Sequence, residues 1–239
     1  MNHRPNILAM IPARRGSTRL KAKNLALLNG RPMITYAIEA SKSAGVFTKI
    51  VVNSEDEIFS DIAKEYGVSF YKRPEELATS SAKSDHVVED FILKNPCDYV
   101  VWVNSISPLQ TGEEIRSVVE YFIKENLDSL VTVRNEQVHA LLGGEPLNFN
   151  PQEVFAQTQD LKPIGLFVYS IMMWRTQKFL ECMKAKGHAI LCGKVGYFPV
   201  SKLSSIIIKR EEDFLIAEYL LAGMKAREDF SVSYHEGNK

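Results

Sequence analysis

Short apolar runs alternate with helical patterns along most of the chain, and each run is bounded by polar or turn residues. Runs of this kind are typical of buried parallel strands. Strands and helices in alternation predict an α/β fold with a doubly wound, mostly parallel sheet, in which ligands bind beyond the carboxyl ends of the strands. The predicted strands are Ile7 to Ile11, Ile50 to Asn53, Tyr99 to Val103 and Leu130 to Val133.

Residues that commonly start helices precede several of the helical patterns. Ser54 is followed by Glu57 and Thr111 by Glu114, so each pair predicts a capping box. Proline suits the first helical turn, so Pro32 is expected to open another helix. The helices predicted in this way run from Ile58 to Tyr66, from Ile115 to Phe122 and from Pro32 to Glu39, and a last helix carries Phe214, Ala217, Leu221 and Met224.

The middle of the chain departs from this alternation. Residues Asn135 to Asp160 are rich in Gly, Pro, Asn and Gln and have little periodicity. The strand pattern resumes from Leu166 to Met173. We therefore predict a single domain over residues 1–239, with an insertion at 135–165 that serves as a lid or as a dimerisation segment.

Composition narrows the class of protein. A chain of 239 residues with 45% hydrophobic residues can bury one large core. Lys and Arg number 29 and so do Asp and Glu, so no global field attracts nucleic acid or an anionic membrane. No signal peptide or membrane-spanning run is legible, and the three cysteines form no C-x-x-C pair, so we expect a cytoplasmic location. The five scattered histidines lack the spacing of zinc ligands.

A basic loop follows the first predicted strand. Between Pro12 and Asn24, five cations surround a Gly-Ser turn. Gly16 lets the backbone approach a ligand, nearby amides can converge on phosphate oxygens, and arginine supplies matching donors. Exposed cations are at least as often a solvated surface. However, the place of this loop at the carboxyl end of a strand favours a polyphosphate site, although it matches neither Walker A nor G-x-G-x-x-G.

Several motifs in and after this loop occur together in one known family. They are Ile11-Pro12-Ala13-Arg14-x-Gly16-Ser17, Lys23-Asn24, Gly30-Arg31-Pro32-Met33-Ile34, Arg73-Pro74-Glu75-Glu76-Leu77-Ala78, Ser107-Pro108-Leu109, and Asp213-Phe214 with Ala217-Glu218. Through them the sequence resembles the acylneuraminate cytidylyltransferase family, of the CMP-sialic acid synthetase type, with some likeness to Kdo cytidylyltransferases. The motifs together span most of the chain.

The resemblance implies a Rossmann-like fold, homodimers, and transfer of CMP from CTP to the anomeric hydroxyl of a small sugar acid, with release of pyrophosphate and assistance from Mg2+. It implies nucleotide contacts at Ala13, Arg14, Gly16, Ser17, Lys23, Asn24, Arg73 and Ser84, with Arg14 and Lys23 as the catalytic cations, and sugar contacts at Asn104 and Ser107. Arg73-Pro74 also fits an ordinary turn after a strand from Ser69 to Tyr71. Ser84 also fits the N-cap of a helix.

The sequence departs from this family at the metal site. The family's Asp-Ile-Asp metal-binding pair reads Ile207-Ile208-Lys209 here, so both carboxylates are missing. Mg2+ requires oxygen ligands, and lysine offers only a positive charge. Three alternatives stay open: Lys209 replaces part of the metal's charge, Glu211 or Glu212 supplies ligands from a shifted register, or catalysis is impaired.

The sugar side departs as well. Gln110 and Thr158 stand where the family carries arginines, and Ser170 begins a segment that differs from the usual Asn-Gly-Ala. These changes remove groups that would bind a sugar carboxylate, so they favour a nonulosonic sugar other than N-acetylneuraminate. Two other functions stay open: a nucleotide-binding homologue that has lost catalysis and serves in regulation or assembly, and a sugar nucleotidyltransferase that uses another base.

Overall fold

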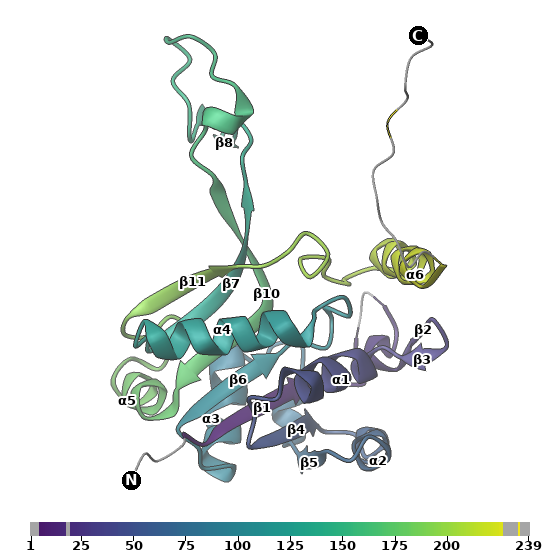
Figure 1. The fold of residues 1–239 in the computed structure, drawn as a ribbon. Helices are drawn as coiled ribbons and strands as arrows, with labels where there is room; N and C mark the ends of the chain where they lie inside the picture. Colours follow the sequence, from purple (N-terminus) through teal and green to yellow (C-terminus); the bar gives the residue numbers. More distant parts are fainter. Residues whose placement is uncertain (1–4, 18–19, 227–233, 235–239) are drawn as a thin grey trace.

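A seven-stranded sheet forms the centre of the molecule, in the strand order β11-β7-β10-β6-β1-β4-β5 (Figure 1). The structure is a computed structural model and describes residues 5–17, 20–226 and 234. Its β10 is antiparallel to β6 and β7, and the other pairs are parallel. The predicted α/β, mostly parallel sheet is therefore confirmed. The strands are β1 (Ile7–Pro12), β4 (Lys49–Ser54), β5 (Ser69–Lys72), β6 (Tyr99–Val103), β7 (Ser129–Glu136), β10 (Ile164–Arg175) and β11 (Val195–Pro199).

Helices cover both faces of the sheet, so the body has three layers (Figure 1). Ala9 and Ile11 of β1 pack into a core with the helices of one face, and Leu8 and Met10 pack into a second core with the helices of the other. Successive side chains of a strand point to opposite faces, which is why one apolar run serves two cores. One face carries α1 (Ile34–Ala44), α2 (Ile58–Glu65) and α4 (Gly112–Lys124), and the other carries α3 (Ser84–Lys94) and α5 (Thr176–Lys186).

The capping box predicted at Ser54 is wrong. Ser54 is the last residue of β4, where it pairs with Lys72 of β5, and α2 begins only at Ile58. The carboxylate of Asp56 instead accepts a hydrogen bond from the backbone N–H of Ile58 at 3.0 Å. Sheet pairing holds the backbone of Ser54 in the strand. The side chain that accepts at the start of α2 is therefore that of Asp56, two positions later.

The box predicted at Thr111 is confirmed in one half. The Thr111 hydroxyl oxygen accepts from the backbone N–H of Glu114 at 3.2 Å, so Thr111 is the N-cap of α4. The carboxylate of Glu114 does not return the bond and accepts from the backbone N–H of Ser201 at 2.6 Å. The Glu114 carboxylate, which the capping-box rule assigns to the start of the helix, therefore binds a segment far along the chain instead.

Two further helix starts differ from the prediction. Pro32 belongs to the short strand β3 (Arg31–Pro32), which forms a hairpin with β2 (Leu27–Leu28), and α1 begins at Ile34 and continues to Ala44. Asn29 and Gly30 have φ values of 49° and 81°, and an Asn-Gly pair in this region is typical of a two-residue hairpin turn. Ser84 is the first residue of α3, and the N-cap is Lys83, whose side chain makes no capping bond.

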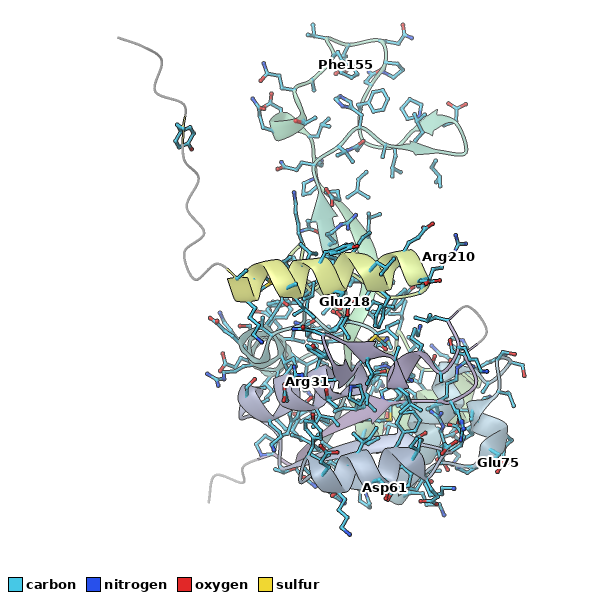
Figure 2. The ribbon with its side chains drawn as sticks, turned by 90° about the vertical axis from the view of Figure 1, so that its right-hand side faces the viewer. Arg31, Asp61, Glu75, Phe155, Arg210 and Glu218 are labelled. Carbon is cyan, nitrogen blue, oxygen red and sulfur yellow. The ribbon has the colours of Figure 1, made fainter. Side chains whose placement is uncertain are left out.

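An arm of residues 137–163 projects from the end of the sheet between β7 and β10 (Figure 1). It contains β8 (Leu141–Leu142), β9 (Glu145–Pro146) and the 3-10 turn η3 (Thr158–Asp160). His139 stacks on Phe155 with ring centroids 4.0 Å apart, and Phe149 packs edge-on against both rings. Figure 2 shows Phe155 near the tip of the arm, far from the body. The arm coincides with the predicted insertion, and its role as a lid or dimer contact stays a prediction.

The last helix, α6 (Glu211–Ala226), lies where the sequence predicts it. Its one fully buried residue is Ala217, and Glu218 holds it to the β2–β3 hairpin by accepting from the backbone N–H of Asn29 at 3.2 Å. The sequence did not predict α5 or β11. Within the residues that the structure describes, no helix combines the length and the apolar character that crossing a membrane requires.

Candidate active site

A cavity of about 310 Å³ opens at the carboxyl ends of β1 and β6. β1 has β4 on one side and β6 on the other, so this is the point where the order of the strands reverses. Crevices at such points bind ligands in open α/β sheets. The lining residues come from the ends of β1 and β6, the connections after β1, β5 and β6, and the first turn of α3: Pro12, Ala13, Arg14, Ser17, Lys23, Asn24, Arg73, Leu77, Thr79, Ser80, Ala82, Ser84, Val87, Trp102, Asn104, Ser105 and Ile106.

The basic loop supplies only part of its charge to this cavity. Arg14 and Lys23 line it, and Arg14 also donates from Nη1 to the carbonyl of Thr79 at 3.0 Å. Arg15 instead forms an ion pair with Asp56 at 2.9 Å and lies outside the lining. Arg19 lies outside the described residues. Two of the five cations, Arg14 and Lys23, therefore line the cavity, while Arg15 forms its ion pair elsewhere.

Asn24 and Ser105 join the ends of the two strands beneath the cavity. The Ser105 hydroxyl lies 3.0 Å from the carbonyl oxygen of Pro12 and 3.0 Å from Oδ1 of Asn24, so its single proton serves one acceptor at a time. The amide of Asn24 donates to the carbonyl of Arg14 at 3.4 Å. Both side chains are buried. Buried polar groups with partners of this kind hold a loop in one conformation.

Arg73 is a buried cation in the cavity wall, with only 4% of its surface exposed. Its Nη2 donates to the carbonyl of Ala13 at 2.8 Å and to the Glu55 carboxylate at 3.1 Å. Burial lowers the pKa of Arg73, and the charge of Glu55 opposes that shift. The Arg73 Nε has no hydrogen-bond partner in the described part of the chain. An ordinary exposed turn would not bury a guanidinium in this way.

Trp102 is a lining residue that the sequence reasoning missed. It stands on β6 among aliphatic residues, and its indole Nε1 is buried without a hydrogen-bond partner among the described residues. An unpaired buried donor is costly unless a ligand or water completes it. A tryptophan at a strand end, where apolar neighbours suffice for packing, was the available signal. Thr79, Ser80 and Ser105 were missed too, because nothing in their spacing marks them.

The remaining predicted residues are placed differently from one another. Ser84 lines the cavity from the start of α3, and Asn104 lines it from the loop after β6. Gly16 is outside the lining, and a Cβ added there would meet nothing within 4 Å, so a close approach at Gly16 stays a prediction. Ser107 is buried and donates to the carbonyl of Ser204 at 2.6 Å, which is a structural contact away from both cavities of the site.

A second cavity, of about 590 Å³, adjoins the first and shares Asn104 and Ile106 with it. Its walls come from the irregular part of β10, Arg134 of β7, the segment before α6 and the first turns of α6. Tyr169 has a φ of 57° at the irregularity in β10, and its carbonyl accepts from the amide of Asn104 at 3.1 Å. The other lining residues are Arg134, Leu166, Phe167, Val168, Ser205, Ile206, Ile207, Lys209, Asp213 and Ile216.

The comparison with known families identifies the protein class. A family model described as cytidylyltransferase matches residues 8–212. The chain belongs to the cytidylyltransferase family. It is 26% identical over 245 residues to N-acylneuraminate cytidylyltransferase of Streptococcus agalactiae serotype V, covering 96% of this chain and 57% of that protein. It is 38% identical over 120 residues to CMP-N,N'-diacetyllegionaminic acid synthase of Legionella pneumophila, covering 48% of this chain and 52% of that protein.

The matched segment covers little more than half the length of each of those relatives. Among solved structures, CMP:2-keto-3-deoxy-manno-octonic acid synthetase complexed with CTP matches this cytidylyltransferase with a TM-score of 0.67 and 14% identity, covering 91% of this chain and 99% of that chain. At this identity the likeness shows the fold alone. The Rossmann-like fold and the family predicted from the motifs are both confirmed.

The residues that replace the metal pair do not fit a Mg2+ held by this cytidylyltransferase. Ile207 and Lys209 offer no oxygen ligand, and the Asp213 carboxylate accepts from the backbone N–H groups of Lys209 and Arg210, both at 2.8 Å. Glu211 and Glu212 line neither cavity, so the lining gives no support to ligands from a shifted register. The described residues contain no group of three or more His, Cys, Asp or Glu side chains placed to hold a metal ion.

Proposed function

We propose that this cytidylyltransferase transfers CMP from CTP to the anomeric hydroxyl of a nonulosonic, sialic-acid-like sugar. The observation that carries the proposal is the cavity at the reversal of strand order, into which Arg14, Lys23 and the buried Arg73 all project. Cations and N–H donors in a fixed arrangement suit a triphosphate. The names of the two curated relatives support the class of sugar.

The chemistry assigns different tasks to the two cavities. The sugar oxygen forms a bond to the α-phosphorus of CTP while the bond from that phosphorus to the bridging oxygen breaks. The electron pair leaves with pyrophosphate, and the hydroxyl proton is released to solvent. Negative charge grows on the leaving group, and Arg14 and Lys23 lower the barrier because they are in place beforehand. A sugar in the second cavity meets the triphosphate at Asn104 and Ile106, which the cavities share.

The double variant Arg14→Ala plus Lys23→Ala tests the nucleotide site. We expect CTP affinity, measured by calorimetry, to fall at least about a hundredfold, since two charge-assisted contacts are lost. Arg15→Ala is the matched control, because this arginine belongs to the same loop but pairs with Asp56 outside the cavity. Unchanged affinity for every nucleoside triphosphate in the double variant would overturn the proposal.

Base choice and turnover separate the proposal from its alternatives. A thermal-shift comparison of CTP, UTP, GTP and ATP is expected to favour CTP, because a ligand that binds the folded state raises the melting temperature. A larger shift with another base would assign another nucleotidyltransferase. CTP binding without pyrophosphate release from any nonulosonic acid would favour the impaired homologue, which the loss of carboxylates at Ile207 and Lys209 motivates.

We also propose a homodimer formed through the arm, and a cytoplasmic location. Apolar side chains gather on the arm and on α6 without covering: Val154 is 94% exposed, Phe155 72% and Tyr219 74%. A second copy of the chain would bury such a surface. Sedimentation velocity is expected to show a dimer that Phe155→Ser plus Leu142→Ser dissociates, and a monomeric wild type would overturn this.

The free thiols Cys97, Cys182 and Cys192 suit a reducing compartment.

A further inference from the structure

The segment before α6 is held rigidly at Ile208. Its backbone N–H donates to the carbonyl of Ile106 at 2.9 Å, and its carbonyl accepts from the Lys23 ammonium at 2.8 Å. Its side chain is fully buried in a small core with Leu28 and Met33. Ile208 therefore ties three parts of the site together: the basic loop, the loop after β6 and the start of α6.

The two residues beside Ile208 face the site instead of the core. Ile207 and Lys209 both line the second cavity, the one that adjoins the proposed triphosphate position. Neighbouring residues of an extended segment point to opposite sides, so burial of Ile208 presents these two side chains to the cavity. The backbone thus offers two cavity-facing positions, and the chain fills them with an apolar group and an ammonium.

The charges around Lys209 leave its ammonium available to an anion. Asp213 is the one acid among the described residues that lines this cavity, and its carboxylate already accepts two backbone N–H groups at the start of α6. Arg134, the other cation in the lining, forms an ion pair with Glu136 at 2.6 Å. Lys23, half-buried in the lining of the first cavity, adds a second ammonium that donates to the carbonyl of Ile208.

We propose that the ammonium groups of Lys209 and Lys23 supply the positive charge beside the triphosphate, so that the site binds CTP without a divalent cation held by the protein. The inference rests on the proposed function. Its physical basis is that a hard cation needs oxygen ligands in a defined geometry, which this segment lacks, whereas a lysine provides a mobile point charge on the polypeptide itself.

Calorimetric titration of CTP into the intact protein, with EDTA or with MgCl2, tests the inference without relying on turnover. We expect the Kd of the wild type in EDTA to stay within about threefold of its value in Mg2+. Lys209→Ala is expected to weaken binding in EDTA about tenfold, and Lys209→Arg to retain most of it. Lys225→Ala is the control, because Lys225 lies in the last turn of α6, away from both cavities.

A gain-of-function variant sharpens the test. Ile207→Asp plus Lys209→Asp places two carboxylates at the cavity-facing positions and removes the ammonium. We expect its CTP binding to become dependent on Mg2+, and Mn2+ binding to appear in electron paramagnetic resonance spectra of the variant but not of the wild type. Circular dichroism checks that the variant folds. If it does not fold, the two single substitutions at Lys209 decide the question.

The outcomes distinguish this inference from the proposed function. Wild-type binding that disappears in EDTA, together with no effect of Lys209→Ala, overturns the role of the lysines and leaves the nucleotide site intact. Failure of the wild type to bind any nucleoside triphosphate, with or without Mg2+, overturns the proposed function and this inference with it. CTP binding in EDTA that falls in Lys209→Ala and survives in Lys225→Ala supports both.

Discussion

The two cavities meet at Asn104 and Ile106, yet their walls are built in different ways. The first has buried polar groups that brace one another across the ends of β1 and β6, with Arg73 and the Asn24–Ser105 pair at its base. The second has four exposed apolar or aromatic side chains in its lining, Leu166, Phe167, Tyr169 and Ile216. A site whose polar groups hold one another in place is formed before its ligand binds. A wall without such bonds can adopt different shapes for different substrates.

The difference follows from where each cavity lies in the fold. The first lies over two adjacent central strands, whose loops have little freedom because both strands are paired on both sides. The second is assembled from the irregular stretch of β10, Arg134 of β7, the segment before α6 and the first turns of α6. Two of the departures from the family motifs, Ile207 and Lys209, fall at this second cavity. Within one fold, such segments can change without disturbing the sheet.

The largest expected effect is that of Arg73→Met at the nucleotide end. We expect CTP affinity to fall about a hundredfold or more and the free energy of unfolding to fall by about 2 kcal/mol, because the half-buried Glu55 carboxylate loses a partner. Arg15→Met removes an exposed ion pair and should cost less than about 1 kcal/mol. Calorimetry measures the CTP affinity, and urea unfolding measures the free energy of unfolding. Equal losses in Arg73→Met and Arg15→Met would contradict the role of the buried polar groups at the first cavity.

A smaller effect is expected from Trp102→Phe. The substitution keeps an aromatic ring but removes the unpaired indole N–H, so CTP affinity should fall about fivefold, and the stability of the free protein should hold or rise. Trp174→Phe is the matched control, since its Nε1 donates to the carbonyl of Ile190 at 2.8 Å. That variant should lose about 1 kcal/mol of stability and bind CTP normally. CTP affinity unaltered by Trp102→Phe would show that its N–H does not contact the nucleotide.

The smallest effect on CTP affinity is expected from Arg134→Met, in the second cavity, where we place the sugar. Its ion pair with Glu136 is partly exposed, so stability should change by less than about 1 kcal/mol. CTP affinity should stay within about twofold, while the KM for the sugar acid rises, because Arg134 lines the proposed acceptor cavity. A large loss of CTP affinity here would remove the distinction between the two ends.

The candidate site was readable from the sequence where its residues stand in short motifs after strands. Eight of the ten residues named for it line the first cavity, from Ala13 through Asn104. The other two are Gly16 and Ser107, and Ser107 is taken up by a bond to Ser204 across the fold. Trp102 was marked in its own segment only by its residue type near a strand end, because an unpaired N–H is a property of what surrounds it.

The sequence by itself determined the alternation of strands and helices, the basic loop at the end of the first strand and the family, because hydrophobic period and motif spacing are local. Only the tertiary structure decided that β10 runs antiparallel, that Arg73 is buried against Glu55, and that Ile207 and Lys209 face a cavity. Each of these depends on contacts between segments far apart in the chain. Such contacts are selected by packing and by the satisfaction of buried polar groups, neither of which a local pattern contains.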